Sequence, residues 1–347
     1  IFAGTELQGG TYQSDAHHVW FSGTIDSPES DITLRGGASS SFVLGLGDVG
    51  VGLPVFHSVT VESAKDVWVL AGTNVVMDGV WTSLMDASGR GEGAVRLNNM
   101  VASSTTTVEN VTWNVNDLLV GWKNVRYGNV VVGSNATINV ARVMETAADG
   151  ENALATSVVL KEGATLNCTS SNGGDLRFAR YLSDQNSTGG LGTGQIHSFT
   201  IDGGTYSAPN AATQFGRGSD YFYTFLKAGL MDVKGLQVRT LDPWRDNLHG
   251  EGVIQTGGEL RVGSAGMTSC YPQWEHPHAD FANGRLTATE SFRTDWGRFL
   301  VAFGVSPVAA GAYTIDLNGK DLTWNSPLMG SSDVTLTGAG SFTANRL

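Results

Sequence analysis

The chain has 347 residues and a formal net charge of −12, which disfavours broad binding to nucleic-acid phosphates and to anionic membrane surfaces. Only 16% of the residues are charged, whereas 41% are hydrophobic and 46 are glycines. This composition is more typical of a secreted β protein than of a disordered chain. No run of about eighteen apolar residues occurs, so the sequence predicts no membrane-spanning helix.

Residues 1–57 are expected to begin the fold. Strands are predicted at 32–37 and 42–47, between turns that are rich in serine and glycine. The less regular segment 15–20 is expected to cover the first coil, because the open end of a stacked structure exposes strand edges. Ile1 is not a methionine, and we expect both ends of the chain to continue in a longer parent protein.

One phrase recurs from Ser58 onward: an alternating strand, a short polar or glycine-rich turn, and a second alternating strand. Alternation with a period of two is typical of half-buried strands. The phrase is clearest at 252–263, where Gly257 and Gly258 are expected to supply the positive φ angles of a tight corner. Further copies are predicted at 58–70, 130–140, 157–168, 198–208, 230–240, 313–324 and 333–344.

The clearest copy also predicts which side chains face the core. Alternate residues of a strand point to opposite faces, so an apolar row and a polar row are expected to separate. The apolar row is expected to contain Ile254, Leu260 and Val262, and the polar row Gln255, Glu259 and Arg261.

Separations of roughly 20 to 40 residues between the copies are typical of a solenoid with variable loops. The predicted fold class is all-β: a right-handed parallel β-helix of about a dozen or more coils, with long loops inserted on one face. We expect a single domain over 1–347. It has a cap and first coils at 1–57, central coils at 58–311 with functional loops at 171–299, and C-terminal coils at 312–347.

Five predicted loops between Arg177 and Phe299 concentrate Trp, Tyr, Arg, Asp and His. Binding or catalytic residues of a solenoid are inserted in its loops, because its strands are committed to packing. Loops from successive coils that share one face would line a groove for a linear polymer. The loops are predicted at 171–192, 209–227, 242–251, 269–281 and 292–299.

Aromatic and polar side chains of these loops form the candidate ligand-binding site. Flat aromatic rings stack on the C–H-rich faces of sugars, and charged neighbours bond the sugar hydroxyls. The alternative is that the rings cover the side of the solenoid as a small second core. The candidates are Trp244, Arg245, Asp246, Tyr271, Trp274, Glu275, Trp296, Arg217, Asp220 and Tyr221, with Tyr223 beside them.

Carboxylates in the same loops leave an enzyme as an alternative. Lyases on β-helix scaffolds remove a proton with Lys, Arg or His, and glycosidases use carboxylate pairs. The spacing here matches no catalytic motif, and Asp and Arg in loops more often form ion pairs and turn caps. We therefore assign no catalytic residue. The carboxylates are Asp242, Asp246, Glu251, Glu275, Asp280 and Asp295.

No cofactor is expected. The HxH pair at 276–278 could bind a metal, but a third protein ligand is unidentified, which disfavours a transition-metal site. Calcium at Asp242 and Asp246 stays an alternative that no loop signature supports. Cys168 and Cys270 have no CxxC spacing; two buried thiols are favoured over a disulfide.

The phrase DVTLTGAGSFTA at 333–344 resembles autotransporter-associated repeats of large secreted bacterial proteins. That resemblance implies a right-handed β-helix and no particular function. By its length, expected architecture and aromatic loops, the chain is also similar to the parallel β-helix carbohydrate-binding module appended to xylanases of gut bacteria. This second resemblance implies non-catalytic binding of xylan, and no functional residue is carried over from it.

The expected function is a non-catalytic carbohydrate-binding module of a secreted enzyme that degrades plant polysaccharides. Its expected partners are xylan and an attached catalytic domain, with no nucleic acid and no membrane. A neutral or lightly substituted xylan suits an acidic protein better than a uronate polymer does. The alternatives are a β-helix lyase or glycosidase, and a structural passenger or adhesin of a bacterial surface.

Overall fold

The computed structural model describes twenty segments of the chain, and every regular element in them is a β-strand. The chain divides into two compact units, Ile1–Cys168 and Thr169–Leu347. The described residues are 2–3, 10–14, 19–22, 26–36, 41–44, 55–62, 66–69, 75–84, 94–97, 103–120, 127–146, 155–172, 176–178, 196–215, 221–238, 252–269, 278–295, 300–303, 310–325 and 328–344.

The strand pairs within unit 1 are all parallel. Its strands are β1 (Phe2–Ala3), β2 (Gly10–Ser14), β3 (Val19–Ser22), β4 (Asp26–Gly36), β5 (Ser41–Leu44), β6 (Val55–Glu62), β7 (Asp66–Val69), β8 (Val75–Leu84), β9 (Ala94–Leu97), β10 (Ser103–Val120), β11 (Tyr127–Val132), β12 (Thr137–Thr146), β13 (Ala155–Lys161) and β14 (Thr165–Cys168).

A Thr–apolar–Asn triplet repeats in register on β10, β12 and β14 of unit 1. The middle residues, Trp113, Ile138 and Leu166, are buried. The Asn139 side chain donates to Oδ1 of Asn114 at 2.8 Å, and Asn167 donates to Asn139 at 2.8 Å. Each such bond stabilises the fold by about 0.5–1.5 kcal/mol. Parallel register thus stacks apolar residues on the inward face and identical asparagines on the outward face.

The strand pairs within unit 2 are also all parallel. Its strands are β15 (Leu176–Phe178), β16 (Ile196–Phe215), β17 (Tyr221–Val238), β18 (Gly252–Gln255), β19 (Glu259–Ser269), β20 (His278–Phe281), β21 (Gly284–Ala288), β22 (Phe292–Asp295), β23 (Leu300–Phe303), β24 (Ala312–Asp316), β25 (Lys320–Trp324), β26 (Leu328–Gly330), β27 (Asp333–Thr337) and β28 (Gly340–Ala344).

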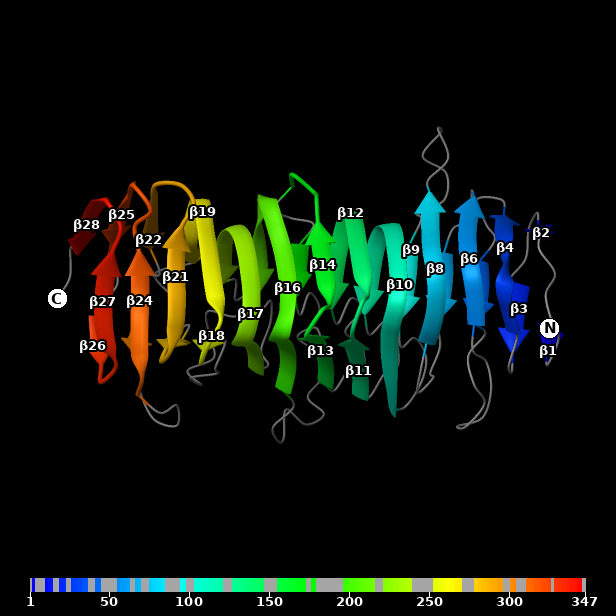
Figure 1. Ribbon diagram of the computed structural model, residues 1–347, viewed down its shortest axis with the longest axis horizontal. Helices are drawn as coiled ribbons and strands as arrows, with labels where there is room; N and C mark the ends of the chain where they lie inside the picture. Colours follow the sequence, from blue (N-terminus) through cyan, green and yellow to red (C-terminus); the bar gives the residue numbers. More distant parts are fainter. Residues whose placement is uncertain are drawn as a thin grey trace, which may run out of the picture. The chain divides into compact units, whose positions relative to one another are not determined.

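The register of unit 2 groups these strands into three stacks, which the chain visits in a fixed order. Stack A contains the first parts of β16 and β17, then β18, β20, β23 and β26. Stack B contains the middle parts of β16 and β17, the first part of β19, then β21, β24 and β27. Stack C contains β15, the last parts of β16, β17 and β19, then β22, β25 and β28. Strands β21, β24 and β27 of stack B lie side by side in Figure 1.

One passage of the chain through stacks A, B and C is called a coil. An aromatic cluster fills the interior at the start of unit 2, where β15 and β16 pair. Phe178 lies 4.5 Å from Phe199 and 5.5 Å from Phe215 between ring centroids. Tyr206 meets Phe178 and Phe199 edge-on at 5.7 and 5.2 Å, and its hydroxyl lies 2.9 Å from that of Thr213. All four rings are buried. Because they come from stacks A, B and C, their packing holds the three stacks around one core.

The all-β, parallel character that the sequence predicts is confirmed, and strands cover most of each recurring phrase. Four of the five predicted loops are shorter than expected because strands enter them. Residues 209–215 and 221–227 of the loop 209–227 belong to β16 and β17, and the other strand residues are 176–178 in β15, 269 in β19, 278–281 in β20 and 292–295 in β22. In the segment 15–20, which was expected to cover the first coil, residues 15–18 lie outside the described residues and Trp20 belongs to strand β3. The expected single domain over 1–347 stays a prediction.

The corner between β18 and β19 corrects the predicted faces. Gln255 is buried and Ile254 is half-exposed, the reverse of the expectation, whereas Leu260 and Val262 are buried as predicted. The alternation changes phase at the corner because Gly258 has a φ of +67°.

Gly257 is required at the same corner for space and not for a positive φ. A Cβ atom on Gly257 would lie 2.2 Å from the carbonyl oxygen of Lys227 in the preceding coil. The corner is therefore closed by direct contact between backbones.

We predict that Gly229→Ala destabilises unit 2 more than Gly319→Ala does. Both glycines have positive φ angles, +87° and +76°, so alanine costs about 1–2 kcal/mol at either position. At Gly229 the new Cβ would also lie 2.1 Å from the Gly204 carbonyl oxygen, whereas nothing lies within 4 Å at Gly319. Overpacking adds about 1–3 kcal/mol at Gly229. Urea unfolding of both variants measures the difference, and equal losses would contradict the crowded corner.

Candidate functional site

The predicted binding residues fall almost entirely outside the described residues. Tyr221 is the first residue of β17, and its backbone pairs with Ile196 of β16. The others lie in segments 216–220, 239–251, 270–277 and 296–299. They are Arg217, Asp220, Trp244, Arg245, Asp246, Tyr271, Trp274, Glu275 and Trp296.

The strands that flank these segments show where each segment is attached. Each of the four, like 179–195, follows a strand of stack C and precedes a strand of stack A. The departure points are in register, since Phe178 pairs with Phe215, Phe215 with Val238, and Val238 with Ser269. Thr268, next to Ser269, pairs with Asp295, the last departure point.

The return points of the same segments are also aligned. Ile196 pairs with Tyr221, and Tyr223, two residues into β17, pairs with Gly252. Gly252 pairs with His278, which pairs with Leu300. The predicted insertions are therefore attached between the same two stacks, coil after coil, whereas the positions of their side chains stay predictions.

Beside these return points, stack A carries a partly exposed aromatic patch: Tyr223, Phe225, Lys227 and Ile254. The rings of Tyr223 and Phe225 stack with centroids 5.8 Å apart and an interplanar angle of 28°. Nζ of Lys227 lies 5.9 Å from the Phe225 centroid, within the range of a cation–π contact. Ile254, which lies one coil later, pairs with Phe225 and is also half-exposed. The patch offers partly exposed aromatic and apolar side chains with a cation at its edge.

Two of the six candidate catalytic carboxylates, Asp280 and Asp295, lie in the described residues, and they are enclosed or already hydrogen-bonded. Asp280, predicted in a loop, lies in β20 in register with Ile254 and is completely buried. Asp295 accepts a hydrogen bond from Arg293 at 2.5 Å. Asp242, Asp246, Glu251 and Glu275 lie outside the described residues, as do His276 and Cys270. Cys168 is buried in unit 1.

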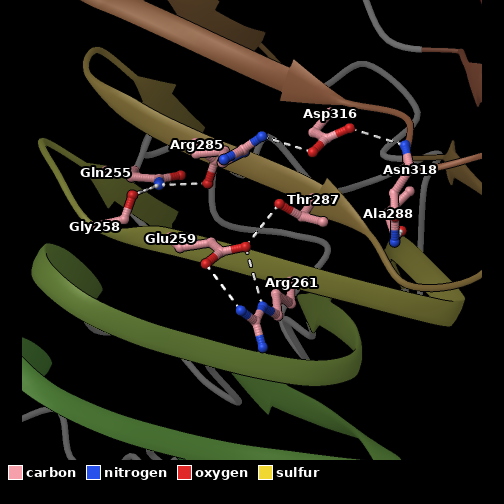
Figure 2. Close-up of polar contacts among 9 residues, drawn as sticks. All are labelled: Gln255, Gly258, Glu259, Arg261, Arg285, Thr287, Ala288, Asp316 and Asn318. Atoms are coloured by element: carbon pink, nitrogen blue, oxygen red, sulfur yellow. Dashed lines mark hydrogen bonds and ion pairs between the residues drawn. The ribbon is translucent and has the colours of Figure 1, made fainter. Parts of the chain in front are cut away.

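Charged side chains form a polar ladder on the outward face of stack B, shown in Figure 2. Arg261 donates two hydrogen bonds to Glu259, at 3.0 and 3.1 Å. Thr287 donates to Oε1 of the same carboxylate at 2.8 Å. In the next coil, Arg285 donates to Asp316 at 2.7 Å. The ladder places opposite charges on neighbouring strands, which avoids like-charge contacts.

The pKa of the Asp232 carboxyl is raised above its ordinary value, whereas the pKa of the Glu259 carboxyl is lowered below its ordinary value. The hydrogen bond from Arg261 lowers the pKa of Glu259, and the bond from Thr287 acts in the same sense. Burial raises the pKa of Asp232, against the attraction of Arg261. Such a divergence is also found in acid–base pairs of enzymes. Both oxygens of Glu259 already accept hydrogen bonds here, which argues for a structural role.

A buried hydrogen-bond network at Gln255 connects the patch to the ladder. Its Nε2 donates to the carbonyl oxygens of Gly258 and Arg285 at 3.2 and 3.0 Å, and the Tyr313 hydroxyl donates to its Oε1 at 2.6 Å. Burial raises the pKa of Tyr313 well above its usual range, so the hydroxyl stays protonated. Figure 2 shows the bonds from Gln255 to Gly258 at its own corner and to Arg285 in the next coil.

Sequence reasoning missed Phe225, Lys227 and Ile254. The stretch 221–226 is YFYTFL, in which five of six residues are apolar or aromatic, so alternation does not identify its outward face. The later Lys227, two positions after Phe225, was the available signal, because a lysine keeps its charged head in water.

No protein-family model matches the chain, and searches of curated proteins and of solved structures give no match. In the described segments, no group of three or more His, Cys, Asp or Glu is placed to hold a metal ion. The same segments include no apolar helix long enough to cross a membrane.

We predict that Tyr313→Phe lowers the free energy of unfolding by about 1–3 kcal/mol, because Oε1 of buried Gln255 loses its donor. Thr335→Val, which removes a hydroxyl from an exposed residue, is the control, and we expect a change within about 0.5 kcal/mol. Urea unfolding of both variants tests this, and equal effects would contradict the role of the buried network.

We predict that Glu259→Gln changes the acid sensitivity of unit 2. A carboxylate whose folded-state pKa lies below its ordinary value of 4.5 stabilises the fold above that pH and loses the contribution as the pH falls further. The stability difference between the wild type and Glu259→Gln should therefore shrink below about pH 4.5. Glu290→Gln, at an exposed turn, is the control. A difference that persists at low pH would contradict the ion pair.

Proposed function

We propose that this chain is a non-catalytic carbohydrate-binding module of a secreted enzyme, with a plant cell-wall polysaccharide, most specifically xylan, as its ligand. The architecture we propose is a right-handed parallel β-helix. In support, the chain of unit 2 passes through stacks A, B and C in a fixed order, and each new strand pairs in parallel with its equivalent one coil earlier.

The observation that carries the proposal is the aligned attachment of the insertions beside the aromatic patch. A linear polymer needs subsites that repeat along one direction, and matched attachment points on successive coils provide that direction. The stacked rings of Tyr223 and Phe225 supply a flat surface of the kind that packs against a sugar ring. Lys227 can donate hydrogen bonds to hydroxyl groups at the edge of the patch.

The acidic chain favours a neutral polymer over a uronate polymer, because the net charge of −12 repels polyanions over long distances. The predicted aromatic residues, Trp244, Trp274, Trp296 and Tyr271, would extend the stacking surface from the insertions. No cofactor is proposed. Calcium at Asp242 and Asp246 stays an alternative.

An enzyme on the same scaffold is the alternative proposal. Its strongest support is the pair Asp232 and Glu259, whose pKa values diverge. Glu259, however, accepts hydrogen bonds from Arg261 and Thr287, which leaves it a poor base or nucleophile. Release of reducing ends or unsaturated products from a polysaccharide panel, lost in Asp232→Asn, would establish the enzyme.

Affinity electrophoresis in gels with and without soluble xylan tests the binding proposal. We expect the wild type to be retarded by xylan, and Phe225→Leu to be retarded less, because leucine keeps the apolar contact but removes the flat ring. The loss of a stacking contact of about 0.5–1.5 kcal/mol corresponds to a roughly two- to tenfold lower affinity. Phe225→Tyr, which keeps the ring, is the matched control.

The same gels test the predicted loop residues through Trp244→Ala and Trp274→Ala. Retardation should change little with salt, because stacking and hydrogen bonds to neutral hydroxyls are weakly screened. Migration unaffected by xylan, or retardation equal in the wild type, Phe225→Leu, Trp244→Ala and Trp274→Ala, would count against this site.

A further inference from the structure

A row of threonines and asparagines crosses seven strands of unit 1 at one register position. On β10, β12 and β14 the row consists of Asn114, Asn139 and Asn167, which are half-exposed. No member of the row is charged or apolar, whereas the polar ladder of unit 2 is built from ion pairs. The register carries the row back through β8, β6, β4 and β2, whose members are Thr82, Thr60, Thr33 and Thr11.

Two more columns of neutral side chains lie beside the three asparagines. Thr112, Thr137 and Thr165 come two residues earlier, are in register with one another and are half-exposed. Two residues earlier again, Asn110 and Asn135 are exposed, and Nδ2 of Asn135 donates to Oδ1 of Asn110 at 3.3 Å. We call this set of eight residues the Asn–Thr face: Asn110, Asn135, Thr112, Thr137, Thr165, Asn114, Asn139 and Asn167.

The face keeps hydrogen-bonding groups that its own ladders do not use. The Asn139 side chain donates one N–H group to Asn114 and accepts one bond from Asn167. An amide has two N–H groups and two acceptor lone pairs, so one of each stays available for a ligand. Amides and hydroxyls both donate and accept, as sugar hydroxyls do, whereas a carboxylate only accepts and an ammonium group only donates. The face therefore matches a neutral ligand that is rich in hydroxyl groups.

The groups of the Asn–Thr face form a regular array. Neighbouring strands lie about 4.8 Å apart, and alternate residues of one strand lie about 6.6 Å apart. A linear β-linked polysaccharide repeats its hydroxyl groups once per ring, at an interval close to the distance between strands. Hydrogen bonds made in exchange for water stabilise little individually, so a ligand that repeats the contact on strand after strand binds more tightly than a single sugar.

We propose that the Asn–Thr face is a second binding surface for neutral xylan, whose chain lies across β10, β12 and β14 in the direction from strand to strand. The inference takes its ligand class from the proposed function and places this contact on unit 1. Charged polymers are disfavoured, because none of the eight residues supplies a cation or a carboxylate. The ladder bonds already order all five asparagines, which reduces the entropy lost when a ligand binds.

Affinity electrophoresis in soluble xylan tests the proposal on a triple variant, Thr112→Val with Thr137→Val and Thr165→Val. Valine keeps the β-branched shape but removes one hydroxyl group from each of the three strands. We expect the affinity of the triple variant for xylan to fall roughly tenfold or more. Far-UV circular dichroism checks that it keeps the β-sheet spectrum. The matched control removes three hydroxyl groups from stack B of unit 2 and should bind like the wild type: Thr314→Val, Thr335→Val and Thr337→Val.

The length of the ligand gives evidence that does not depend on the triple variant folding. Xylo-oligosaccharides of increasing length are titrated calorimetrically into Phe225→Leu, in which the contribution of the aromatic patch is reduced. Affinity should rise with each added sugar, because each one reaches the groups of the next strand. Equal affinity for short and long oligosaccharides would overturn the proposal.

The Asn–Thr face and the aromatic patch fail in different ways. If xylan retards the triple variant as much as the wild type but retards Phe225→Leu less, the face is excluded and the patch is retained. If only the triple variant loses retardation, the face is retained and the patch is excluded, and losses in both variants support both surfaces. A unit 2 control that loses as much as the triple variant would overturn the face, and a wild type that xylan does not retard would overturn both proposals.

Discussion

Parallel register between successive coils is the constraint on which the other features of unit 2 depend. Strands in one stack lie about 4.8 Å apart, so each side chain contacts its equivalent in the coil before and after it. An inward row is therefore mainly apolar, as Met231, Leu260 and Leu286 are, and a polar member such as Gln255 has its hydrogen bonds satisfied inside. An outward row must avoid neighbouring like charges, which the order Asp232, Arg261, Thr287 achieves.

The same constraint explains how much of the fold could be predicted from the sequence. Alternation in β24 and β27 is regular, so both strands and their shared orientation were predictable. The phase change at Gly258 was not, because it depends on a backbone angle that the neighbouring residues do not reveal. Gln255 was assigned to the wrong face for a second reason. Its partner Tyr313 lies 58 positions away, so no local pattern could indicate that a polar side chain is satisfied inside the core.

The candidate site was predictable in a different sense. The density of aromatic and charged residues indicates which segments interrupt the strands, and the register places their attachment points on one side. The individual contacts of the patch were not predictable, because the run before Lys227 is apolar on both faces.

The connections between stacks in unit 2 differ in how much added chain they can accommodate. At the joint between stacks A and B, the backbone of Gly258 lies against that of Gly229, and a single added carbon atom collides there. At the joint between stacks C and A, the connections between strands are as short as 325–327 and as long as 179–195. The A-to-B joint therefore has no room for an added side chain, whereas the C-to-A joint accommodates segments of different lengths. New recognition segments could therefore be grafted at the C-to-A seam without re-engineering the strands, one coil at a time.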